Sequence, residues 1–383
     1  MRIGFLALIP LLFALLVLPW PKVPRSFVKT LLFVIQVLPL PAKPLQWLTR
    51  SPVREQVTYT LPLGEGSGDL YRPAGGRKRA GILVFLGIIP VPQDDPRVVN
   101  LGTALARLGF IALFPWSRAM MDKRITPEEP GNMVQAFNRL ADTEGVDADR
   151  LGMVGFCVGG SILAIAASDP RINDRVSFLS AFGAYHDIGD VMAQIASHTS
   201  IFHDDQDPWE ANHLSKEVMA CQAVEALEAD HDRQTLTSLF LEADPGSTDV
   251  PEGLSPDGDI VFTLLRSMTA AGPEHHLSIE AAQDLVARFS PSYRARLDSI
   301  SPVSAIGNLK ARVLIAHDLE DNLVPVEESR RLAEALASGG NATLTEFSLF
   351  SHVTPDKKVD KLTFLKESTK LFRYAYSIVR LAG

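Results

Sequence analysis

Stretches of continuous apolar residues alternate with helical patterns along most of the chain. Residues 56–61 and 69–73, on either side of a glycine-rich turn, alternate between apolar and polar positions as paired strands do. The continuous apolar runs that follow predict strands buried on both faces of a sheet. The stretches between them place apolar residues three or four positions apart, as amphipathic helices do. The strands predicted from such runs are 80–86, 110–114, 151–154, 176–179 and 312–316, and a further strand is predicted at 343–348. The predicted helices are 95–108, 133–143, 161–168, 327–337 and 357–381.

This order of elements predicts the fold class. Strands that alternate with helices form a parallel sheet covered on both faces. We therefore expect an α/β fold with a mainly parallel central sheet flanked by helices. Residues 56–185 and 303–383 would form this core.

The alternation stops in residues 186–302, where helical patterns and polar loops predict a helical lid insertion. Because the segment leaves and rejoins the sheet between two strands, it should lie over the carboxyl ends of the strands. Its large apolar side chains either line the underside of the lid or pack the lid against itself, and the pattern favours neither. These side chains are Phe240, Leu241, Phe262, Leu264 and Leu265, and the candidate helices are 214–229, 233–242, 258–271 and 278–289.

The N-terminal 41 residues are more apolar than the rest. Residues 3–18 carry no charge, and a second apolar run covers 31–40. Each run is shorter than the roughly 20 residues of a membrane-spanning helix, and no small-residue cleavage site follows the first. We expect 1–41 to be an uncleaved membrane anchor and 42–55 a linker. The protein would then be associated with a membrane, on a side that the flanking charges leave open; the alternative is a signal peptide followed by a buried helix.

Composition narrows the possible functions. The chain has 383 residues, of which 46% are apolar, and this is enough for a large core. A net charge of −8 argues against nucleic acid as a partner, since phosphate binding needs a basic surface. The only cysteines are Cys157 and Cys221, too few for a disulfide framework.

The most informative motif is the hexapeptide 155–160, Gly-Phe-Cys-Val-Gly-Gly. It follows a predicted strand and precedes a predicted helix, as the Gly-x-Ser-x-Gly nucleophile turn does, with cysteine in the serine position. Cys157 would be the nucleophile, and the helix N-terminus would favour its thiolate form. The backbone N–H groups of Val158 and of Ile88 (or of Gly87) would form an oxyanion hole.

A base and an acid should follow the nucleophile in chain order, each just after a strand. His352 follows the strand 343–348, and Asp321 follows the strand 312–316. The histidine would take the thiol proton and later protonate the leaving group, while the carboxylate fixes its tautomer. Asp318 and Glu320 compete for the acid role; Asp321 is preferred because it stands at the far side of the turn.

Other polar clusters indicate no cofactor. The acidic and histidine-containing stretch 203–213 fits no standard metal-ligand spacing and predicts a solvated loop before a helix. Cys221 lies on an apolar helical face and is interpreted as a buried structural thiol. We therefore expect neither a metal site nor an organic cofactor.

The hexapeptide 155–160, together with Asp321 and His352, resembles the dienelactone hydrolase family of the α/β-hydrolase superfamily. The resemblance covers the predicted core and implies hydrolysis of an ester or lactone through a thioester acyl-enzyme, without metal or organic cofactor. Leu86 departs from the pattern, because many relatives have histidine before the glycine at this point. Arg118 could correspond, by position only, to an arginine that binds a substrate carboxylate.

These observations favour an enzyme that hydrolyses a small-molecule ester or lactone, with the apolar lid residues pointing to an apolar substrate. Two alternatives remain open. An acyltransferase or thioesterase-like enzyme would use the same triad and pass the acyl group to an acceptor other than water. A catalytically silent member of the fold would serve as a binding protein.

Overall fold

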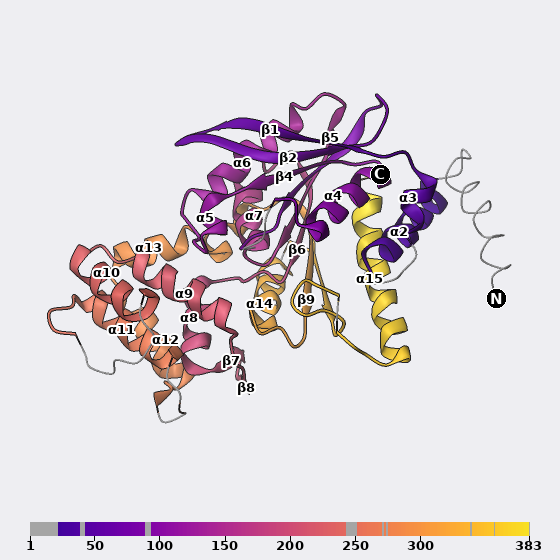
Figure 1. Cartoon of the computed structure of the whole chain (residues 1–383). Coiled ribbons are helices and arrows are strands. Elements are labelled where there is room, and N and C mark those ends of the chain that lie inside the picture. The colour runs from indigo at the N-terminus through magenta and orange to yellow at the C-terminus, as the bar shows by residue number, and fades with distance from the viewer. Residues whose placement is uncertain are drawn as a thin grey trace.

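The computed structural model describes residues 22–38, 43–88, 93–242, 251–269, 272, 275–337, 339–355 and 357–382. Their central feature is an eight-stranded sheet in the order β1-β2-β4-β3-β5-β6-β9-β10, with helices on both faces (Figure 1). The strands are β1 (Val53–Leu61), β2 (Gly64–Arg72), β3 (Arg79–Phe85), β4 (Ile111–Trp116), β5 (Val146–Phe156), β6 (Val176–Phe182), β9 (Arg312–Asp318) and β10 (Ala342–Phe347).

The sheet is mainly parallel, as predicted. The hairpin β1–β2 and the pair β2–β4 are antiparallel, and every pair from β4 to β10 is parallel. The fully buried strands are those read as continuous apolar runs; β3, for example, is buried from Ala80 to Phe85. The α/β fold class predicted from the sequence is therefore confirmed.

Two sets of helices cover the two faces. On one face, apolar side chains of α6 (Glu129–Ala141), α7 (Val158–Ser168) and α14 (Val326–Ala337) join the main core. The other face is covered by α2 (Lys22–Val37), α4 (Pro96–Leu108) and α15 (Lys361–Ala382), whose side chains form two further clusters. The bounds of α4 follow from its caps, since Asp95 accepts the N–H of Arg97 and Gly109 (φ 101°) ends the helix.

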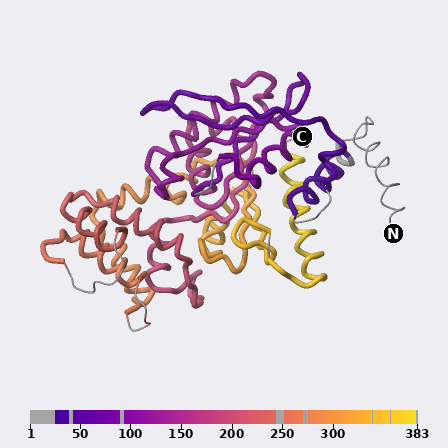
Figure 2. Tube along the Cα trace, viewed as in Figure 1, coloured from indigo at the N-terminus to yellow at the C-terminus, as the bar shows by residue number. Residues whose placement is uncertain are grey.

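Helix α2 contradicts part of the expected anchor. Its side chains Val28, Leu32 and Val34 are buried against the sheet domain, and each buried side chain of this size contributes about 2 kcal/mol to folding. Figure 2 shows this N-terminal helix beside α15, at the opposite end of the chain. The second apolar run is therefore largely part of the domain, because its periodic apolar face meets α4 and α15.

The remaining N-terminal predictions have separate outcomes. The first apolar run, 3–18, lies outside the described residues, so its role as an anchor stays a prediction. Within the described part of the chain, no helix combines the length and apolar character that crossing a bilayer requires. The expected linker 42–55 contains the helix α3 (Pro44–Leu48) and the first residues of β1.

Residues 186–302 form a helical body beside the sheet, between β6 and β9 (Figure 1). Four of its helices lie near the candidate ranges, although the segment read as the single range 233–242 is split between α10 and a π-helical turn, Ser238–Glu242. The structure adds α8, α13 and a two-stranded hairpin that the sequence patterns did not identify. The elements are α8 (Ile188–Ser197), β7 (Thr199–Phe202), β8 (Asp205–Pro208), α9 (His213–Glu225), α10 (Asp230–Thr237), α11 (Pro256–Thr269), α12 (Ile279–Ala287) and α13 (Pro291–Asp298).

Candidate active site

Cys157 occupies a strained turn between β5 and α7. Its backbone has φ 54° and ψ −139°, a conformation that L-residues rarely adopt. The glycines around it are required by space: a Cβ on Gly155 would stand 2.5 Å from the Cα of Gly160, and one on Gly159 would stand 2.4 Å from the oxygen of Phe85. The turn therefore lifts the Cys157 side chain to the carboxyl edge of the sheet, as a nucleophile turn requires.

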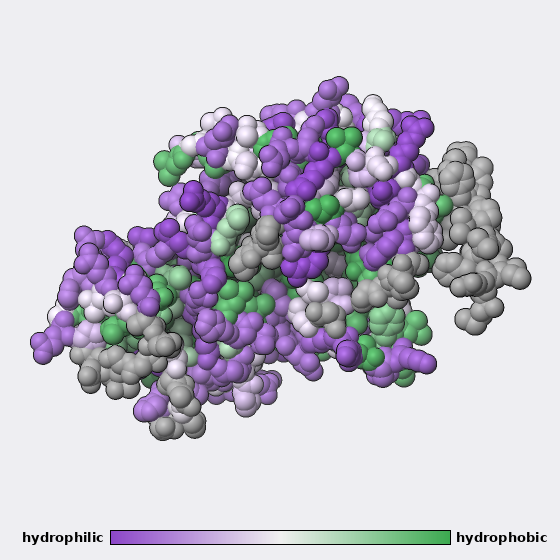
Figure 3. All heavy atoms as spheres, viewed as in Figure 1, coloured by the Kyte–Doolittle hydropathy of each residue, from purple (hydrophilic) through white to green (hydrophobic). Residues whose placement is uncertain are grey.

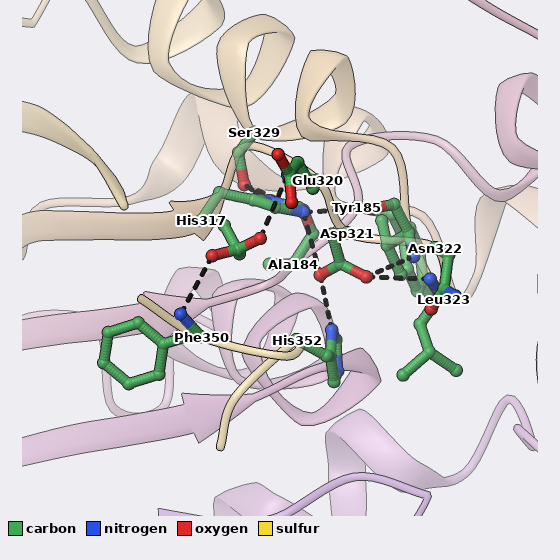
Figure 4. Close-up of polar contacts among 12 residues, drawn as sticks. Ala184, Tyr185, His317, Glu320, Asp321, Asn322, Leu323, Ser329, Phe350 and His352 are labelled. Carbon is green, nitrogen blue, oxygen red and sulfur yellow. Dashed lines mark hydrogen bonds and ion pairs between the residues drawn. The ribbon is translucent and has the colours of Figure 1, made fainter. Parts of the chain in front are cut away.

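His352 and Asp321 meet at the same edge. His352 lies after β10 and Asp321 after β9, and His352 Nδ1 is 2.5 Å from Asp321 Oδ2 (Figure 4). Gly183 (φ 68°), just after β6, lies against this pair; a Cβ there would be 2.9 Å from His352 Cε1. Glycine at position 183 therefore leaves the room that the His352 imidazole occupies.

The Asp321 carboxylate is buried but well supported. Its Oδ1 accepts the N–H groups of Leu323 (2.7 Å) and Val324 (3.3 Å), and its Oδ2 also lies 3.3 Å from His317 Nε2. Burial acts to raise the pKa of Asp321, but the charges and hydrogen bonds of His352 and His317 outweigh it and hold that pKa below its usual range. Asp321 is thus ionised at neutral pH and can orient His352.

His317 was not identified from the sequence as part of the site. It is fully buried, with Nδ1 2.6 Å from Ser329 Oγ and Nε2 3.0 Å from the oxygen of Val324. It therefore holds the turn that presents Asp321. The sequence did carry one signal for His317: it lies in the last residues of a buried strand, four positions before Asp321.

The two competing acids have other partners. Asp318 is buried and accepts the N–H of Phe350 (3.0 Å) and a hydrogen bond from Lys357 Nζ (2.5 Å). Glu320 is exposed and pairs with Lys357 at 3.1 Å. Asp318 therefore ties the loop that carries His352 to β9, whereas Asp321 contacts the imidazole itself.

His352 and Cys157 line the same pocket. The second ring nitrogen of His352, Nε2, is buried and has no well-formed hydrogen bond with the described residues. Burial tends to lower the pKa of His352, but the Cys157 and Asp321 charges raise it well above its ordinary value. An imidazole in this setting readily holds a proton taken from the thiol, and such hydrogen bonds often tighten only when substrate binds.

A pocket of about 80 Å³ encloses Cys157 and His352. The core contributes Tyr185, Leu86 and Ile88, and the insertion contributes apolar side chains from two helices. These are Ile188, Val191 and Ile195 on α8 and Leu214, Val218 and Met219 on α9.

The large apolar residues proposed for the underside of the lid do not line this pocket. Phe262, Leu264 and Leu265 are buried in the core of the insertion and its neighbours, and the Phe240 ring packs on Phe262 with centroids 5.9 Å apart. Of the two alternatives that the pattern left open, packing of the insertion against itself holds for these residues. The helices α8 and α9 face the pocket instead: α8 is the first helix after β6, and the start of α9 is hydrogen-bonded to the loop after β9.

Both expected oxyanion donors lie at the pocket. Val158 and Ile88 line it, and Val158 is the first residue of α7, where N–H groups lack partners within the helix. Gly87 (φ 73°) brings its loop against the turn, since a Cβ there would be 2.6 Å from the nitrogen of Gly159. Val158 and Ile88 thus both border the space beside Cys157, and their role as oxyanion donors stays a prediction.

The insertion is hydrogen-bonded to the loop that carries the acid. Trp209 Nε1 donates to the oxygen of Asp321 (2.7 Å), and Ser215 Oγ donates to the oxygen of Leu323 (2.6 Å). These hydrogen bonds hold the start of α9 against the loop that carries Asp321.

Three other sequence candidates lie away from the pocket. The Arg118 side chain is 96% exposed and pairs only loosely with Asp122 (3.9 Å), so it does not reach the substrate space. The stretch 203–213 forms an exposed hairpin edge and the start of α9, and the described residues contain no group suited to a metal ion. Cys221 is half-buried on α9, where burial raises the pKa of its thiol.

The order of the strands and the turn that carries Cys157 define the class of protein: the chain has the α/β-hydrolase fold. One solved structure agrees with this fold: that of the esterase Est22 superposes with a TM-score of 0.51 at 13% identity, covering 98% of this chain and 90% of the esterase. A hyperthermophilic esterase from Pyrobaculum calidifontis covers 97% of this chain and 96% of its own at 14% identity, with a TM-score of 0.45.

Sequence comparison finds a more specific likeness over a shorter stretch. A probable 2-oxo-3-(5-oxofuran-2-ylidene)propanoate lactonase from a Bradyrhizobium species is 30% identical over 138 residues. The match covers 34% of this chain and 50% of the lactonase, so the chain spans about half the length of this curated relative. No protein-family model matches the chain.

Proposed function

We propose that this protein hydrolyses a carboxylic ester or lactone through a thioester on Cys157, in the manner of dienelactone hydrolases. The observation that carries the proposal is the convergence of Cys157 and the His352–Asp321 pair in one pocket. The lactonase similarity supports the reaction class, because that relative is named for opening a lactone.

The proposed first half-reaction forms the acyl-enzyme. His352 Nε2 takes the Cys157 proton, and the thiolate attacks the carbonyl carbon. The carbonyl oxygen becomes an oxyanion held by the N–H groups of Val158 and Ile88. When the C–O bond breaks, His352 gives its proton to the leaving oxygen, which departs as an alcohol or, for a lactone, stays attached to the acyl chain as a hydroxyl.

The second half-reaction releases the acid. Water gives a proton to His352 Nε2 and attacks the thioester carbon through the same oxyanion, and the Cys157 thiolate leaves and recovers its proton from His352. Throughout, Asp321 keeps Nδ1 protonated and the ring oriented. One water is consumed per ester cleaved, and each proton step is assigned to His352.

The nucleophile is tested by labelling and substitution. Cys157→Ala should lower kcat/KM for p-nitrophenyl acetate by about 10³-fold or more, while the matched control Cys221→Ala keeps near-full activity. Mass spectrometry after brief exposure to p-nitrophenyl acetate should find the acetyl group on Cys157. Acetylation of Cys221 alone, or full turnover by Cys157→Ala, would overturn the proposal.

The same assay separates the two alternative functions. Hydrolysis predicts that the acid product matches the released p-nitrophenol even when an alcohol acceptor is added. An acyltransferase would convert most of the acyl group into a new ester. A non-catalytic binding protein would turn over no ester or lactone in the panel and would form no acyl-cysteine.

Membrane association through residues 3–18 is a separate proposal, supported only by the uncharged apolar run. The suitable comparison is the full chain against a form that begins at Lys22, because α2 is part of the folded domain. The full chain should sediment with membranes and the shorter form should not. Equal partitioning of the two forms would overturn the anchor.

A further inference from the structure

A second and larger cavity adjoins the site. It has a volume of about 530 Å³ and lies on the face of the sheet covered by α2, α4 and α15. Ligand cavities in proteins usually measure roughly 300–1,000 Å³. The pocket around Cys157, at about 80 Å³, is by contrast too small for more than a few heavy atoms.

The two spaces share a wall. Leu86, Ile88 and Val353 line both the Cys157 pocket and the larger cavity. Leu86 and Ile88 belong to the loop after β3 that supplies the proposed oxyanion donor, and Val353 follows His352. A substrate held at Cys157 therefore has the larger cavity directly behind the oxyanion loop.

The cavity is suited to an apolar ligand. Its walls are mostly aliphatic and aromatic side chains, and several of the polar groups on its lining are already paired. Asp95 binds Arg97, Asn100 accepts from Gln36 (2.8 Å), and the Ser180 and Tyr374 hydroxyls are 2.7 Å apart. The apolar walls include Phe33 on α2, Leu101 and Leu105 on α4, and Leu371, Ala375 and Ile378 on α15.

The cavity is partly open to the surface and is lined mostly by hydrophobic and aromatic side chains, as ligand sites are. Figure 3 shows a largely hydrophilic face on which hydrophobic residues gather near α15 and between the insertion and the sheet domain. The cavity therefore has the size and the lining of a binding site for an apolar ligand.

We propose that this cavity holds the acyl chain of an ester or lactone whose acyl part is a medium or long hydrocarbon. The assignment rests on the proposed function. The acyl side is chosen because His352 must reach the leaving oxygen, whereas Leu86 and Ile88, two of the three shared residues, flank the carbonyl on the oxyanion side. The substrate class is thus an ester or lactone with a hydrocarbon chain on the carbonyl carbon.

The test is the chain-length profile of kcat/KM for p-nitrophenyl acetate, butanoate, octanoate, dodecanoate and hexadecanoate, each below its micelle concentration. The wild type should gain up to about fourfold per added methylene until the cavity is full. Leu101→Trp and Ala375→Leu, which fill opposite walls, should move the optimum to shorter chains and lower kcat/KM for dodecanoate at least tenfold, with acetate turnover changed less than twofold. Ala333→Leu, the same change at a half-buried alanine on α14 that lines neither space, is the matched control.

Two results would overturn the inference while leaving the proposed function intact. One is a chain-length profile that neither filling variant changes, although Cys157→Ala abolishes turnover. The other is an effect of Leu101→Trp that follows the length of the alcohol, in a series of acetate esters, and not the length of the acyl chain.

Binding gives an independent measurement that does not need turnover. Cys157→Ala protein should enhance the fluorescence of cis-parinaric acid, and adding Leu101→Trp or Ala375→Leu should weaken that binding at least tenfold, with unchanged circular dichroism. Binding that appears only after removal of residues 1–21 would mean that this segment, and not an acyl chain, occupies the cavity, and would overturn the inference.

Discussion

Replacing Asp321 by asparagine tests the site at the group whose surroundings are best defined. The amide has nearly the shape of the carboxylate, so its oxygen can still accept the N–H groups of Leu323 and Val324. Its NH₂ group would then face His352 Nδ1, which must become an acceptor. The proton of the imidazole moves to Nε2, and His352 can no longer take the proton of Cys157.

The expected loss is large. An imidazole in the wrong tautomer lowers kcat by about 10⁴-fold in the serine hydrolases where this exchange is understood, equivalent to about 5 kcal/mol of transition-state stabilisation. The substitution also removes a charge that raises the pKa of His352, so that pKa should fall. We expect kcat/KM for p-nitrophenyl acetate to drop by at least 10³-fold.

Two matched variants separate catalysis from folding. Asp318→Asn changes an equally buried carboxylate that contacts Phe350 and Lys357 but not His352, so it should lower the melting temperature more than it lowers activity. Glu320→Gln changes a side chain that is 78% exposed and should leave both unchanged. If Asp321→Asn stays within tenfold of wild type while Asp318→Asn is the more damaging to kcat, the role given to Asp321 is refuted.

Four further substitutions test parts of the structure outside that pair. Gly183→Ala places a Cβ 2.9 Å from His352 Cε1 at a φ of 68°, so kcat and the melting temperature should both fall, with about 1–3 kcal/mol lost in urea unfolding; unchanged kcat would contradict the placement of the ring. Burial raises the pKa of Glu328 to about 7 in the folded protein, from its ordinary value of 4.5. Protonated Glu328 therefore stabilises the fold at a pH below 4.5. This contribution to the free energy of unfolding, about 3 kcal/mol, is lost as the pH rises through 7. The free energy of unfolding in urea should fall between pH 5 and pH 8 in the wild type but not in Glu328→Gln. An identical pH dependence in the wild type and the variant would contradict this role of Glu328. Val218→Trp should block the Cys157 pocket and raise KM for p-nitrophenyl acetate, whereas Leu264→Ala should lower stability by about 2–5 kcal/mol with KM unchanged; the reverse pattern would mean that α9 does not face the substrate.

Glu328 also shows what sequence patterns miss. It stands in the first turn of α14 in an apparently ordinary amphipathic helix, yet it is fully buried. Its carboxylate accepts the N–H groups of His186 (3.0 Å) and Asp187 (3.1 Å) and the amide of Gln194 (2.8 Å). These partners lie more than a hundred residues earlier, at the start of the insertion, so no local period could indicate that this glutamate joins the insertion to the sheet domain.

The sequence alone determined the strands of the central sheet, many of the helices and the Cys157 turn, because each depends on local properties: which face of an element is apolar, and where only glycine fits. Asp318, Glu320 and Asp321 lie within four residues at the end of one strand, and the preference for Asp321 from the sequence rested only on its place in the turn. The tertiary structure decided it, since the geometry of the turn directs Asp321 to the imidazole and Asp318 to the neighbouring loop.

The same distinction holds for the substrate space. Apolar residues in the insertion were visible in the sequence, but packing alone showed that Phe262 and Leu264 fill the insertion and that α8 and α9 face Cys157. The larger cavity is formed by segments from both ends of the chain, α2 and α15, around the apolar face of the sheet. Periodicity shows that a residue is buried. Only the fold decides which residues it packs against and whether a cavity is left between them, because those contacts join residues far apart in the chain.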